Sequence, residues 1–598
     1  MKVSLCYLFN AALQQKSVPS DWRRGLIVPL FKEGDKELAS NYRGITLLSI
    51  VGKLFATIIE KRLSRWCEDK RIFEQEQAGF RAGRSTVNHI FTLAEIIRRK
   101  KRMNKPTYAC FLDIKKAYDT VWREGLWDKL QRIGIHRDLL QTIKNLYSEV
   151  KSSVILNDRM TEWFDIKLGL RQGCVLSPIL FLIFINDLIK ELKASGLGIA
   201  IGSMKVSNLA FADDIVLLAD NKANLQRLIA ISESYARKWR FTFNAKKCKV
   251  VVFNGKKAKP DVFLDGERLD VVSEYKYLGV WFDSKLNWKL HKETILSKAK
   301  RRAYIMMGFG VYKLLPASTC VRLWEVLVRP ILEYAGEVWG EGPWEEAEKL
   351  QREIGRLILG VPTQTPTEMV MGDLGWWDLK ARRDKARLKL LKKLSELDDG
   401  EYTKELVSDK LSTWWEYSET ILNSLKVSKL EYKAKDQREW RTIITDRMQK
   451  RVESLWRENI KRKTKLRTYA TIKDKLQLEP YLHFKSRLAR TTLARLRGGT
   501  SFLRIETGRY EKEDREERLC LWCKNAVEDE KHFLLECDLY KDIRQKTLVS
   551  LNLDAGPPDH TRLKRMMGGG KWNYSEEKVL THYIICPRKL RERFVGLL

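Results

Sequence analysis

The sequence lacks any apolar run long enough to cross a membrane. Its longest conspicuous run is ILFLIFI at Ile179–Ile185, far short of the roughly 20 residues that a bilayer-spanning helix needs. The N-terminal stretch MKVSLCYLFNAALQQ carries one early lysine but turns polar too soon for a signal peptide. These two absences predict a protein without a membrane partner.

Cysteine and histidine are also scarce, with ten and seven in 598 residues. Most of the cysteines, such as Cys6, Cys110 and Cys174, stand alone among apolar neighbours. That pattern is typical of buried thiols in a reducing compartment and argues against a disulfide framework.

Acidic residues are outnumbered, because 112 Lys and Arg face 77 Asp and Glu, which gives a net charge of +35. Self-repulsion of that size destabilises a compact chain unless a polyanion neutralises it, so nucleic acid is the expected partner. The run RRKKRMNK at Arg98–Lys105 is a candidate for polyanion binding or for a nuclear signal, and a solvated helix end is an equally good interpretation. We expect an intracellular protein, nuclear or cytoplasmic, with the nucleus favoured.

What is present points to several domains, since 598 residues exceed one compact core. GLIVPLFK (Gly25–Lys32) and YACFLDI (Tyr108–Ile114) read as buried strands, and Val51–Lys70 has the apolar spacing of a helix. From about residue 290 to 510 strand signals fade, and stretches such as DLKARRDKARLKLLKKLSEL predict long basic amphipathic helices.

Two adjacent carboxylates occur in NLAFADDIVLLAD, at Asn208–Asp220. The apolar runs on either side read as short strands, which places Asp213 and Asp214 at a hairpin turn. An Asp-Asp turn is common and explains the pair without any function. The alternative is a divalent metal site, which needs further carboxylates from another strand.

CFLDIKKAYDTV supplies that second site, because Asp113 closes a hydrophobic strand before the helix-like KKAYDTVW. Taken alone, such an aspartate is more often a cap than a ligand. Between the two acidic sites lies LGLRQGCVLSPILFLIFINDLI, a loop with Gly169 and Gly173 followed by Ser-Pro and an apolar helix. These glycines allow a close approach of the backbone to a bound base pair; an ordinary loop and helix start is the simpler interpretation.

The ordered set of motifs from about Val18 to Gly279 resembles the reverse transcriptases of non-LTR (LINE-type) retrotransposons. VPLFKEGDKELASNYRGITLLS and QAGFRAGRSTVNHI are similar to fingers motifs. FLDIKKAYDTV, GLRQGCVLSP and FADD match the three palm motifs, and FTFNAKKCKVVVF and YLGVWFD resemble the next motif and the primer grip.

This resemblance implies roles for single residues. Asp113, Asp213 and Asp214 match the carboxylates that hold two Mg²⁺ ions, and hard cations prefer such oxygen ligands. The carbonyl of Ile114 would add a ligand. Tyr118 lies where relatives carry an aromatic residue that blocks a ribose 2′-hydroxyl, although a core aromatic is the simpler interpretation.

Further polar residues are candidates around the nucleotide. Gln172 and Gly173 match the loop that lines its pocket. Lys246 or Lys247 would protonate the leaving pyrophosphate, with Lys247 favoured. Candidates for phosphate contacts, for which solvated surface roles are equally plausible, are Lys32, Arg43 and Arg81.

The chain departs from many such relatives at both ends of the polymerase. The fingers motif begins within about 25 residues of Met1, so we expect no endonuclease domain ahead of it in this sequence. No ribonuclease H signature follows the palm. The sequence is expected to be a fragment of a longer element or a polymerase whose nick comes from elsewhere.

The expected fold class is α+β, a right-hand polymerase followed by a basic helical C-terminal region with a small zinc module. The predicted divisions are fingers and palm at 1–285, a helical thumb at 286–400, a basic nucleic-acid-binding region at 401–510, a zinc knuckle at 511–550, and a flexible segment with a short final helix at 551–598.

The expected activity is RNA-templated DNA synthesis from a DNA 3′-end, with RNA template, DNA primer or target, and deoxynucleoside triphosphates as partners. An RNA-templated RNA polymerase shares a palm, but FADD and Tyr118 argue against it. A splicing polymerase of mobile introns is a further relative. A catalytically idle remnant that only binds RNA remains open, although Asp113, Asp213 and Asp214 are all present.

The remaining cysteines cluster in CLWCKNAVEDEKHFLLECDLY. Cys520 and Cys523 are two residues apart, His532 follows after eight intervening residues and Cys537 after four more. Four such ligands within 18 residues suit a closed structural Zn²⁺ site. Three buried cysteines and a stray histidine are the alternative. The stretch also resembles the Cys-Cys-His-Cys module that follows the polymerase in non-LTR elements.

Overall fold

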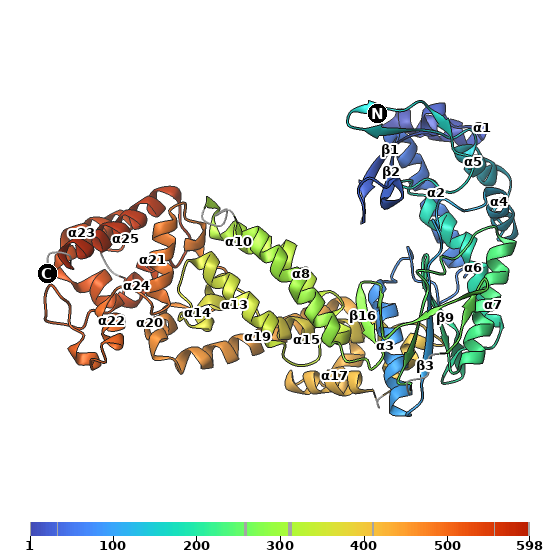
Figure 1. The fold of residues 1–598 in the computed structure, drawn as a ribbon. Coiled ribbons are helices and arrows are strands. Elements are labelled where there is room, and N and C mark those ends of the chain that lie inside the picture. Colours follow the sequence, from blue (N-terminus) through green and yellow to red (C-terminus); the bar gives the residue numbers. More distant parts are fainter. Residues whose placement is uncertain are drawn as a thin grey trace. The chain divides into compact units, whose positions relative to one another are not determined.

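The computed structural model describes residues 2–32, 34–255, 260–308, 314–409, 412–554 and 557–595. The chain folds into two compact units (Figure 1). Unit 1 comprises Met1–Leu290 and Leu394–Glu416, and unit 2 comprises His291–Lys393 and Tyr417–Leu598. The chain therefore leaves unit 1, returns to it for one short segment and leaves again.

A five-stranded sheet with strand order β14-β11-β3-β10-β9 forms the centre of unit 1. Its middle strand β3 pairs antiparallel with β10 on one side and with β11 on the other. The strands are β3 (Thr107–Leu112), β9 (Asn208–Phe211), β10 (Asp214–Ala219), β11 (Lys249–Phe253) and β14 (Asp270–Val271).

Alternate residues of these strands face opposite sides of the sheet, as the two-residue period of a strand requires. On one side Cys110, Leu112 and Leu217 join the hydrophobic core together with helices α6 (Ser177–Ala194) and α7 (Lys222–Lys238). On the other side Phe111 stacks on Tyr275, with ring centroids 4.1 Å apart. Tyr275 belongs to the hairpin of β15 (Glu274–Tyr277) and β16 (Val280–Asp283).

A second sheet in unit 1 follows the order β2-β1-β4-β5, with β6 paired to β4. Strand β1 pairs antiparallel with β2 and parallel with β4. The strands are β1 (Arg24–Phe31), β2 (Tyr42–Leu48), β4 (Lys151–Leu156), β5 (Arg159–Met160) and β6 (Phe164–Asp165). Two small hairpins are β7 (Ile199–Ile201) with β8 (Met204–Val206) and β12 (Phe263–Leu264) with β13 (Glu267–Arg268).

The remaining helices of the first segment of unit 1 surround these sheets. They are α1 (Lys2–Gln15), α2 (Ile50–Asp69), α3 (Thr86–Arg102), α4 (Arg123–Arg132) and α5 (Arg137–Tyr147). Helix α2 begins after Ser49, whose hydroxyl accepts the Gly52 N–H as an N-cap. The sequence also predicts a helix over KKAYDTVW, but Lys115–Thr120 form turns, because Lys116 takes a left-handed φ of 48°.

The segment Leu394–Glu416 packs on α3 and includes helix α16 (Tyr402–Ser408). The Glu401 carboxylate binds the Arg84 guanidinium through both oxygens, at 2.5 and 2.7 Å. Trp414 packs edge-on against Phe91, with ring centroids 4.8 Å apart, and both rings are buried. The segment thus covers a helix face that the first 290 residues leave apolar.

The basic run RRKKRMNK lies at the end of α3, and most of its cations are bound within unit 1. Arg98, Lys100 and Arg102 form ion pairs with Glu95, Asp220 and Asp409. Lys101 donates to the carbonyl of Lys285 at 2.8 Å.

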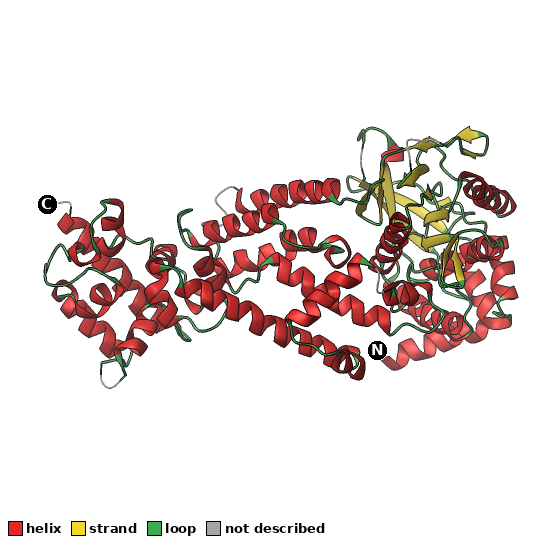
Figure 2. Ribbon diagram, turned by 90° about the horizontal axis from the view of Figure 1, so that it is seen from below, coloured by secondary structure: helices red, strands yellow, loops and turns green. Residues whose placement is uncertain are grey.

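The regular secondary structure of unit 2, within its described residues, is helical apart from two isolated β-bridges (Figure 2). Its first segment holds α8 (Lys289–Met307, beginning in unit 1), α10 (Ala317–Leu323), α11 (Arg329–Glu333), α12 (Gly336–Trp339), α13 (Glu345–Leu359), α14 (Thr367–Leu374) and α15 (Leu379–Ser395, ending in unit 1).

The second segment of unit 2 is also largely helical. It holds α17 (Thr413–Ser424, beginning in unit 1), α18 (Lys429–Ala434), α19 (Gln437–Lys461), α20 (Arg467–Ile472), α21 (Arg487–Arg497), α22 (Arg504–Tyr510), α23 (Lys541–Ser550), α24 (Asp559–Met566) and α25 (Tyr574–Val595). The final helix is longer than the sequence predicts. Part of DAGPPDH lies outside the described residues.

A buried ionic cluster stands in the core of unit 2. The carboxylate of Asp373 accepts hydrogen bonds from Arg497 at 2.8 Å, from Tyr469 at 2.9 Å and from Tyr481 at 2.8 Å. Glu479 also pairs with Arg497, at 2.9 Å. Each charge has a close partner, which a charge so far from water requires.

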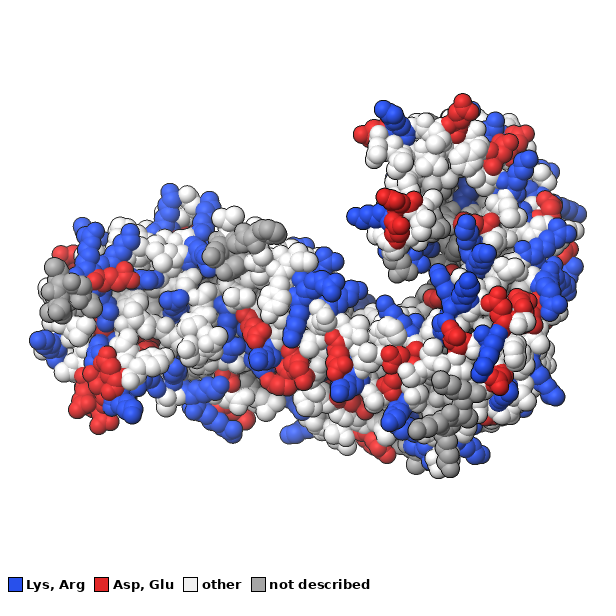
Figure 3. Space-filling view, in the orientation of Figure 1, with Lys and Arg blue, Asp and Glu red and all other residues white. Residues whose placement is uncertain are grey.

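Lys and Arg spread widely over the surface in Figure 3, with Asp and Glu between them. Across the described residues, no helix combines the length and the apolar character that a membrane span demands.

Candidate active site

The two adjacent aspartates lie at the tight turn between β9 and β10. Asp214 opens β10 opposite Phe211 of β9, so the turn consists of Ala212 and Asp213. Ala212 adopts a left-handed conformation with φ of 60°, which is unusual for a residue with a side chain. Its methyl group is buried, whereas Asp214 is exposed.

Asp113 is brought beside this turn by the pairing of β3 with β10. Ile215 stands opposite Leu112, so the residues that flank this pair, Asp214 and Asp113, emerge at the same end of the sheet. The backbone of Asp113 is fixed on both sides: its N–H donates to the Cys248 sulfur at 3.3 Å, and its carbonyl accepts from Asn244 at 2.8 Å.

Asp213 raises the pKa of both other carboxyl groups. Although the surface of Asp214 reaches solvent, desolvation by the surrounding protein, then the charges of Asp213 and Asp113, raise its pKa to about 6. Burial and Asp213 likewise raise the pKa of Asp113, while Lys247 and Lys32 lower it. Crowded carboxylates of this kind bind a proton or a cation more readily than separate ones.

The side chains of these aspartates make no hydrogen bond or ion pair with the part of the chain that the structure describes. Their oxygens are therefore free to bind a hard divalent cation such as Mg²⁺. They do not form a closed cage by themselves, since they are absent from the described groups whose ligand atoms all lie within 4.8 Å.

Tyr118 lies half-buried after the turns that follow Asp113, and its ring stacks on Phe181 of α6. Burial and the charge of Asp213 raise the pKa of its hydroxyl, and Arg43 lowers it. Arg43 belongs to strand β2.

Gln172 and Gly173 lie against strand β2. The carbonyl of Gln172 accepts the Thr46 N–H at 2.9 Å, and its side-chain amide donates to Asp119 at 2.9 Å. Gly173 has φ of 108°, and a Cβ there would lie 2.5 Å from the carbonyl oxygen of Thr46. A Cβ on Gly169 would likewise lie 2.5 Å from the carbonyl of Asp119. Both glycines therefore permit close contacts within the protein.

A cavity of about 440 Å³ opens beside Gln172 and is also lined by Gly44, Thr46 and Asp119. Asp119 was not predicted from the sequence, although it stands in the same motif as Asp113 and Tyr118. Its role as the partner of Gln172 depends on folding, because 53 residues separate the two.

The other predicted site residues differ in whether they already have partners within the protein. The charges of Lys247 and Lys32 both act on Asp113 and lower its pKa. Ile114 forms an isolated bridge with Phe243. Arg81 binds both oxygens of Glu68, at 2.7 and 2.8 Å, and two backbone carbonyls. Its guanidinium must leave these partners before it can meet a phosphate.

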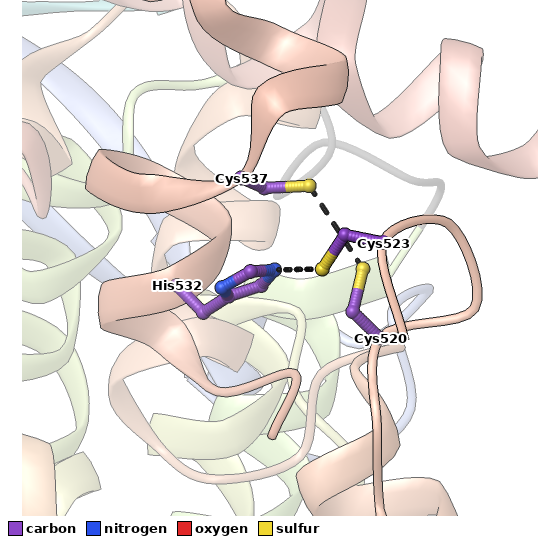
Figure 4. A group of neighbouring side chains, drawn as sticks. All are labelled: Cys520, Cys523, His532 and Cys537. Atoms are coloured by element: carbon purple, nitrogen blue, oxygen red, sulfur yellow. Dashed lines mark hydrogen bonds between the residues drawn. The ribbon is translucent and has the colours of Figure 1, made fainter. Parts of the chain in front are cut away.

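The four predicted zinc ligands come together in unit 2 (Figure 4). The Cys520 and Cys537 sulfurs are 3.8 Å apart, and the Cys523 sulfur lies 3.4 Å from Nε2 of His532. Taking one ligand atom from each residue, all lie within 4.8 Å of one another. Hydrogen bonds from Cys537, His532 and nearby backbone N–H groups lower the pKa of Cys520.

Local structure explains why these ligands converge. The Cys520 N–H donates to the Ala526 carbonyl at 2.9 Å, which closes the knuckle that carries Cys523. His532 opens a π-helical turn that ends before Cys537. Within that turn Phe533 and Leu534 are buried; Phe533 packs on Phe502 and Tyr540.

Comparison with known proteins adds the following similarities. Residues 31–282 match the model of the family described as reverse transcriptase (RNA-dependent DNA polymerase). Over 382 residues the chain is 29% identical to the RNA-directed DNA polymerase from mobile element jockey of Drosophila funebris. The alignment covers 62% of this chain and 41% of that protein.

Two further similarities are more limited. Over 278 residues the chain is 31% identical to the retrovirus-related Pol polyprotein from type-1 retrotransposable element R2 of Popillia japonica, covering 44% of this chain and 38% of that protein. A solved apo telomerase from Candida tropicalis aligns with a TM-score of 0.33 at 14% identity, over 47% of this chain and 58% of that one. The chain spans about two fifths of the length of these curated relatives.

Proposed function

We propose that this chain, which belongs to the reverse transcriptases of non-LTR retrotransposons, copies RNA into DNA by extending a DNA 3′-end. The observation that carries the proposal is the convergence of Asp113 with Asp213 and Asp214 at one end of the central sheet, with their side chains left unpaired by the described residues. Two-metal nucleotidyl transfer requires carboxylates from separate strands in this arrangement.

Asp113, Asp213 and Asp214 would hold two Mg²⁺ ions, with the carbonyl of Ile114 as a further candidate ligand. The chemistry that Mg²⁺ supplies at such a site is activation of a hydroxyl nucleophile and neutralisation of phosphate charge. The raised pKa values of Asp113 and Asp214 support this assignment, because a cation relieves the repulsion between the carboxylates.

The nucleotide would lie between this acidic group and strand β2. Lys32 and Lys247 are positioned to attract the triphosphate, and Lys247 would give a proton to the departing pyrophosphate. Tyr118 would occupy the space that a ribose 2′-hydroxyl needs. Gln172 and Gly173 would line the pocket from the side of β2, and the remaining candidates for phosphate contacts are Arg43 and Arg81.

We assign the fingers and palm to residues 1–285, the thumb to 286–400 and a basic nucleic-acid-binding region to 401–510. The net charge of +35 supports template RNA and primer or target DNA as partners. Deoxynucleoside triphosphates would be the substrates.

The module at 511–550 would bind one structural Zn²⁺ through Cys520, Cys523, His532 and Cys537. Their proximity supports this proposal, because four N/S ligands leave no open position for catalysis.

Primer extension by the purified chain tests the polymerase. We expect incorporation of deoxynucleotides on an RNA template with Mg²⁺. Asp213→Asn should lower the rate by roughly 10³-fold or more, since it removes several kcal/mol of transition-state stabilisation. Asp265→Asn, at an exposed hairpin tip, is the matched control and should leave the rate unchanged. Activity of Asp213→Asn close to that of the wild type would contradict the assignment. Preferential ribonucleotide incorporation would favour the RNA polymerase alternative.

A further inference from the structure

A short segment far away in sequence lies along the free edge of β9. The Ala210 N–H donates to the carbonyl of Glu76, and the Ala78 N–H donates to the carbonyl of Ala210, both at 2.9 Å. Gln77 and Ala210 form a parallel β-bridge. Residues 76–78 thus continue the central sheet beyond its last strand and reach the turn that carries Asp213.

The side chain of Gln77 binds that turn directly. Its Oε1 accepts the N–H of Ala212 at 2.9 Å and the N–H of Gly79 at 2.8 Å. Both partners are donors, so the orientation of the amide is fixed by its hydrogen bonds. Gln77 is completely buried, and it therefore acts on the turn from inside the protein.

Ala212 needs such support because it holds a left-handed conformation, with φ of 60°. Residues with a Cβ rarely keep this conformation unless the surrounding structure imposes it. The backbone of Ala212 sets the direction in which the chain enters Asp213 and Asp214. A buried side chain that binds the Ala212 N–H can therefore fix the positions of both carboxylates.

Gly79 closes the other side of the same contact. A Cβ at this position would lie 2.4 Å from the nitrogen of Ala212 and 3.0 Å from its Cα. Its φ lies outside the left-handed region, so glycine is needed here for space rather than for conformation. Any larger residue would push the backbone of the turn.

The segment is itself held from behind. Nε2 of His89 lies 3.0 Å from the carbonyls of both Glu76 and Ala210. Arg81 donates to the carbonyl of Gln77 at 3.0 Å. Tyr402, in the segment that returns from unit 2, donates its N–H to the side chain of Gln75 at 3.3 Å. Gln77 is therefore anchored well enough to impose a conformation on the turn.

We propose that Gln77 is a positioning residue for the polymerase reaction: together with the space left by Gly79, it holds Ala212 left-handed and so aims Asp213 and Asp214. The inference rests on the proposed function for the role of the aspartates. The contact between Gln77 and Ala212 can nevertheless be tested without any catalysis.

Two variants of Gln77 separate hydrogen bonding from shape. Gln77→Met keeps the length of the side chain but has no oxygen acceptor, so the Ala212 N–H loses its partner. Gln77→Glu keeps an acceptor oxygen. Asn186→Leu is the matched control: the Asn186 amide accepts from the Glu74 N–H and donates to the Ile72 carbonyl, so it holds the start of the same segment without touching the turn.

The first readout is amide hydrogen exchange of the intact chain, followed in peptides that span residues 209–215. Exchange at Ala212 should be faster in Gln77→Met than in the wild type, whereas Gln77→Glu and Asn186→Leu should keep its protection. The second readout is steady-state primer extension. Gln77→Met should lower kcat roughly 10–100-fold, as expected for a misplaced reacting group, with little change in the KM for the nucleotide. It should also raise the Mg²⁺ concentration needed for half-maximal rate. Gln77→Glu should recover most of the rate.

The outcomes discriminate clearly. Unchanged exchange at Ala212 in Gln77→Met would overturn the proposal whatever happens to the rate. Equal losses of kcat in Asn186→Leu and Gln77→Met would also overturn it, because general loosening would then explain both. Faster exchange at Ala212 with an unaltered kcat would show that the turn needs no such positioning. If the wild type itself has no polymerase activity, the proposed function fails while the exchange result still reports the contact.

Discussion

The ring of Tyr118 stacks on that of Phe181, with centroids 5.1 Å apart and 16° between the ring planes. Phe181 is buried in α6, so this contact presses Tyr118 against a rigid surface. An aromatic ring that excludes an atom by its volume must be held in place, because a mobile ring would yield. The stacking therefore unites the two interpretations of Tyr118, as a core aromatic and as a steric gate.

Tyr118→Val should admit ribonucleotides. We expect its preference for deoxyribonucleotides to fall by roughly 10–200-fold, the range for a changed pocket contact of 1–3 kcal/mol. The measurement is the ratio of kcat/KM for a deoxynucleotide and the matching ribonucleotide. Tyr118→Phe retains the ring and should keep the preference. A loss in this variant as large as in Tyr118→Val would show that the hydroxyl, and not the volume of the ring, discriminates between the two sugars.

Cys523→Ser should abolish zinc binding by the full chain. The wild type should contain one zinc per chain by elemental analysis, and a chelator should unfold the module, because metal binding and folding are coupled. Cys586→Ser is the matched control, because the Cys586 sulfur contacts His582 and, among the described residues, Cys586 is not part of the group of four ligands. Full zinc occupancy in Cys523→Ser would exclude the site.

His89 should make unit 1 less stable in acid. Burial lowers the pKa of its imidazole to about 4, against an ordinary value of 6.5. The unfolded chain therefore takes up a proton first as pH falls, so this contribution is complete above pH 6.5 and is lost toward pH 4. The loss amounts to about 3 kcal/mol at 1.36 kcal/mol per pKa unit.

Urea unfolding at pH 7.5 and 4.5 measures this effect. His89→Gln keeps an N–H donor but cannot titrate, so its stability should fall less steeply between the two pH values than that of the wild type. His136→Gln, at an exposed position, should follow the wild type. Identical slopes for wild type and His89→Gln would refute the prediction.

Asp373→Asn should destabilise unit 2 by about 3–5 kcal/mol, the usual cost of removing one partner of a buried ion pair. The variant leaves the buried Arg497 guanidinium short of one negative partner. Asp446→Asn, which breaks an exposed pair with Lys450, should change stability by less than about 0.5 kcal/mol. Chemical unfolding curves of the two variants provide the comparison, and equal effects would argue against a structural role for the cluster.

Local patterns in the sequence predict much of this fold. The apolar runs at Gly25–Lys32 and Tyr108–Ile114 become β1 and β3, and the predicted helix Val51–Lys70 is α2. The short spacing of Cys520, Cys523, His532 and Cys537 correctly indicates that these side chains meet. In each case the deciding interactions lie within a few residues along the chain.

Local sequence patterns do not predict contacts between residues that are far apart in the chain. The hydrogen bond from Ala212 to Gln77 spans 135 residues, and nothing near Gln77 in the sequence reveals that its partner is the turn before Asp213. Nothing near Gly173 in the sequence reveals that a Cβ there would meet the carbonyl oxygen of Thr46. Helical periodicity also fails to predict the turns at Lys115–Thr120, because the left-handed conformation of Lys116 changes the direction of the backbone.

The return of Leu394–Glu416 to unit 1 means that unit 1 cannot be isolated by a single cut in the chain. A fragment that stops at residue 290 contains all three aspartates but loses the Trp414 that covers Phe91, the carboxylate that neutralises Arg84 and the backbone N–H that meets Gln75. Such a fragment would expose the apolar face of α3 next to residues 76–78, which support the turn that carries Asp213 and Asp214. An exchange of the helical residues between related elements must therefore leave Leu394–Glu416 together with the rest of unit 1.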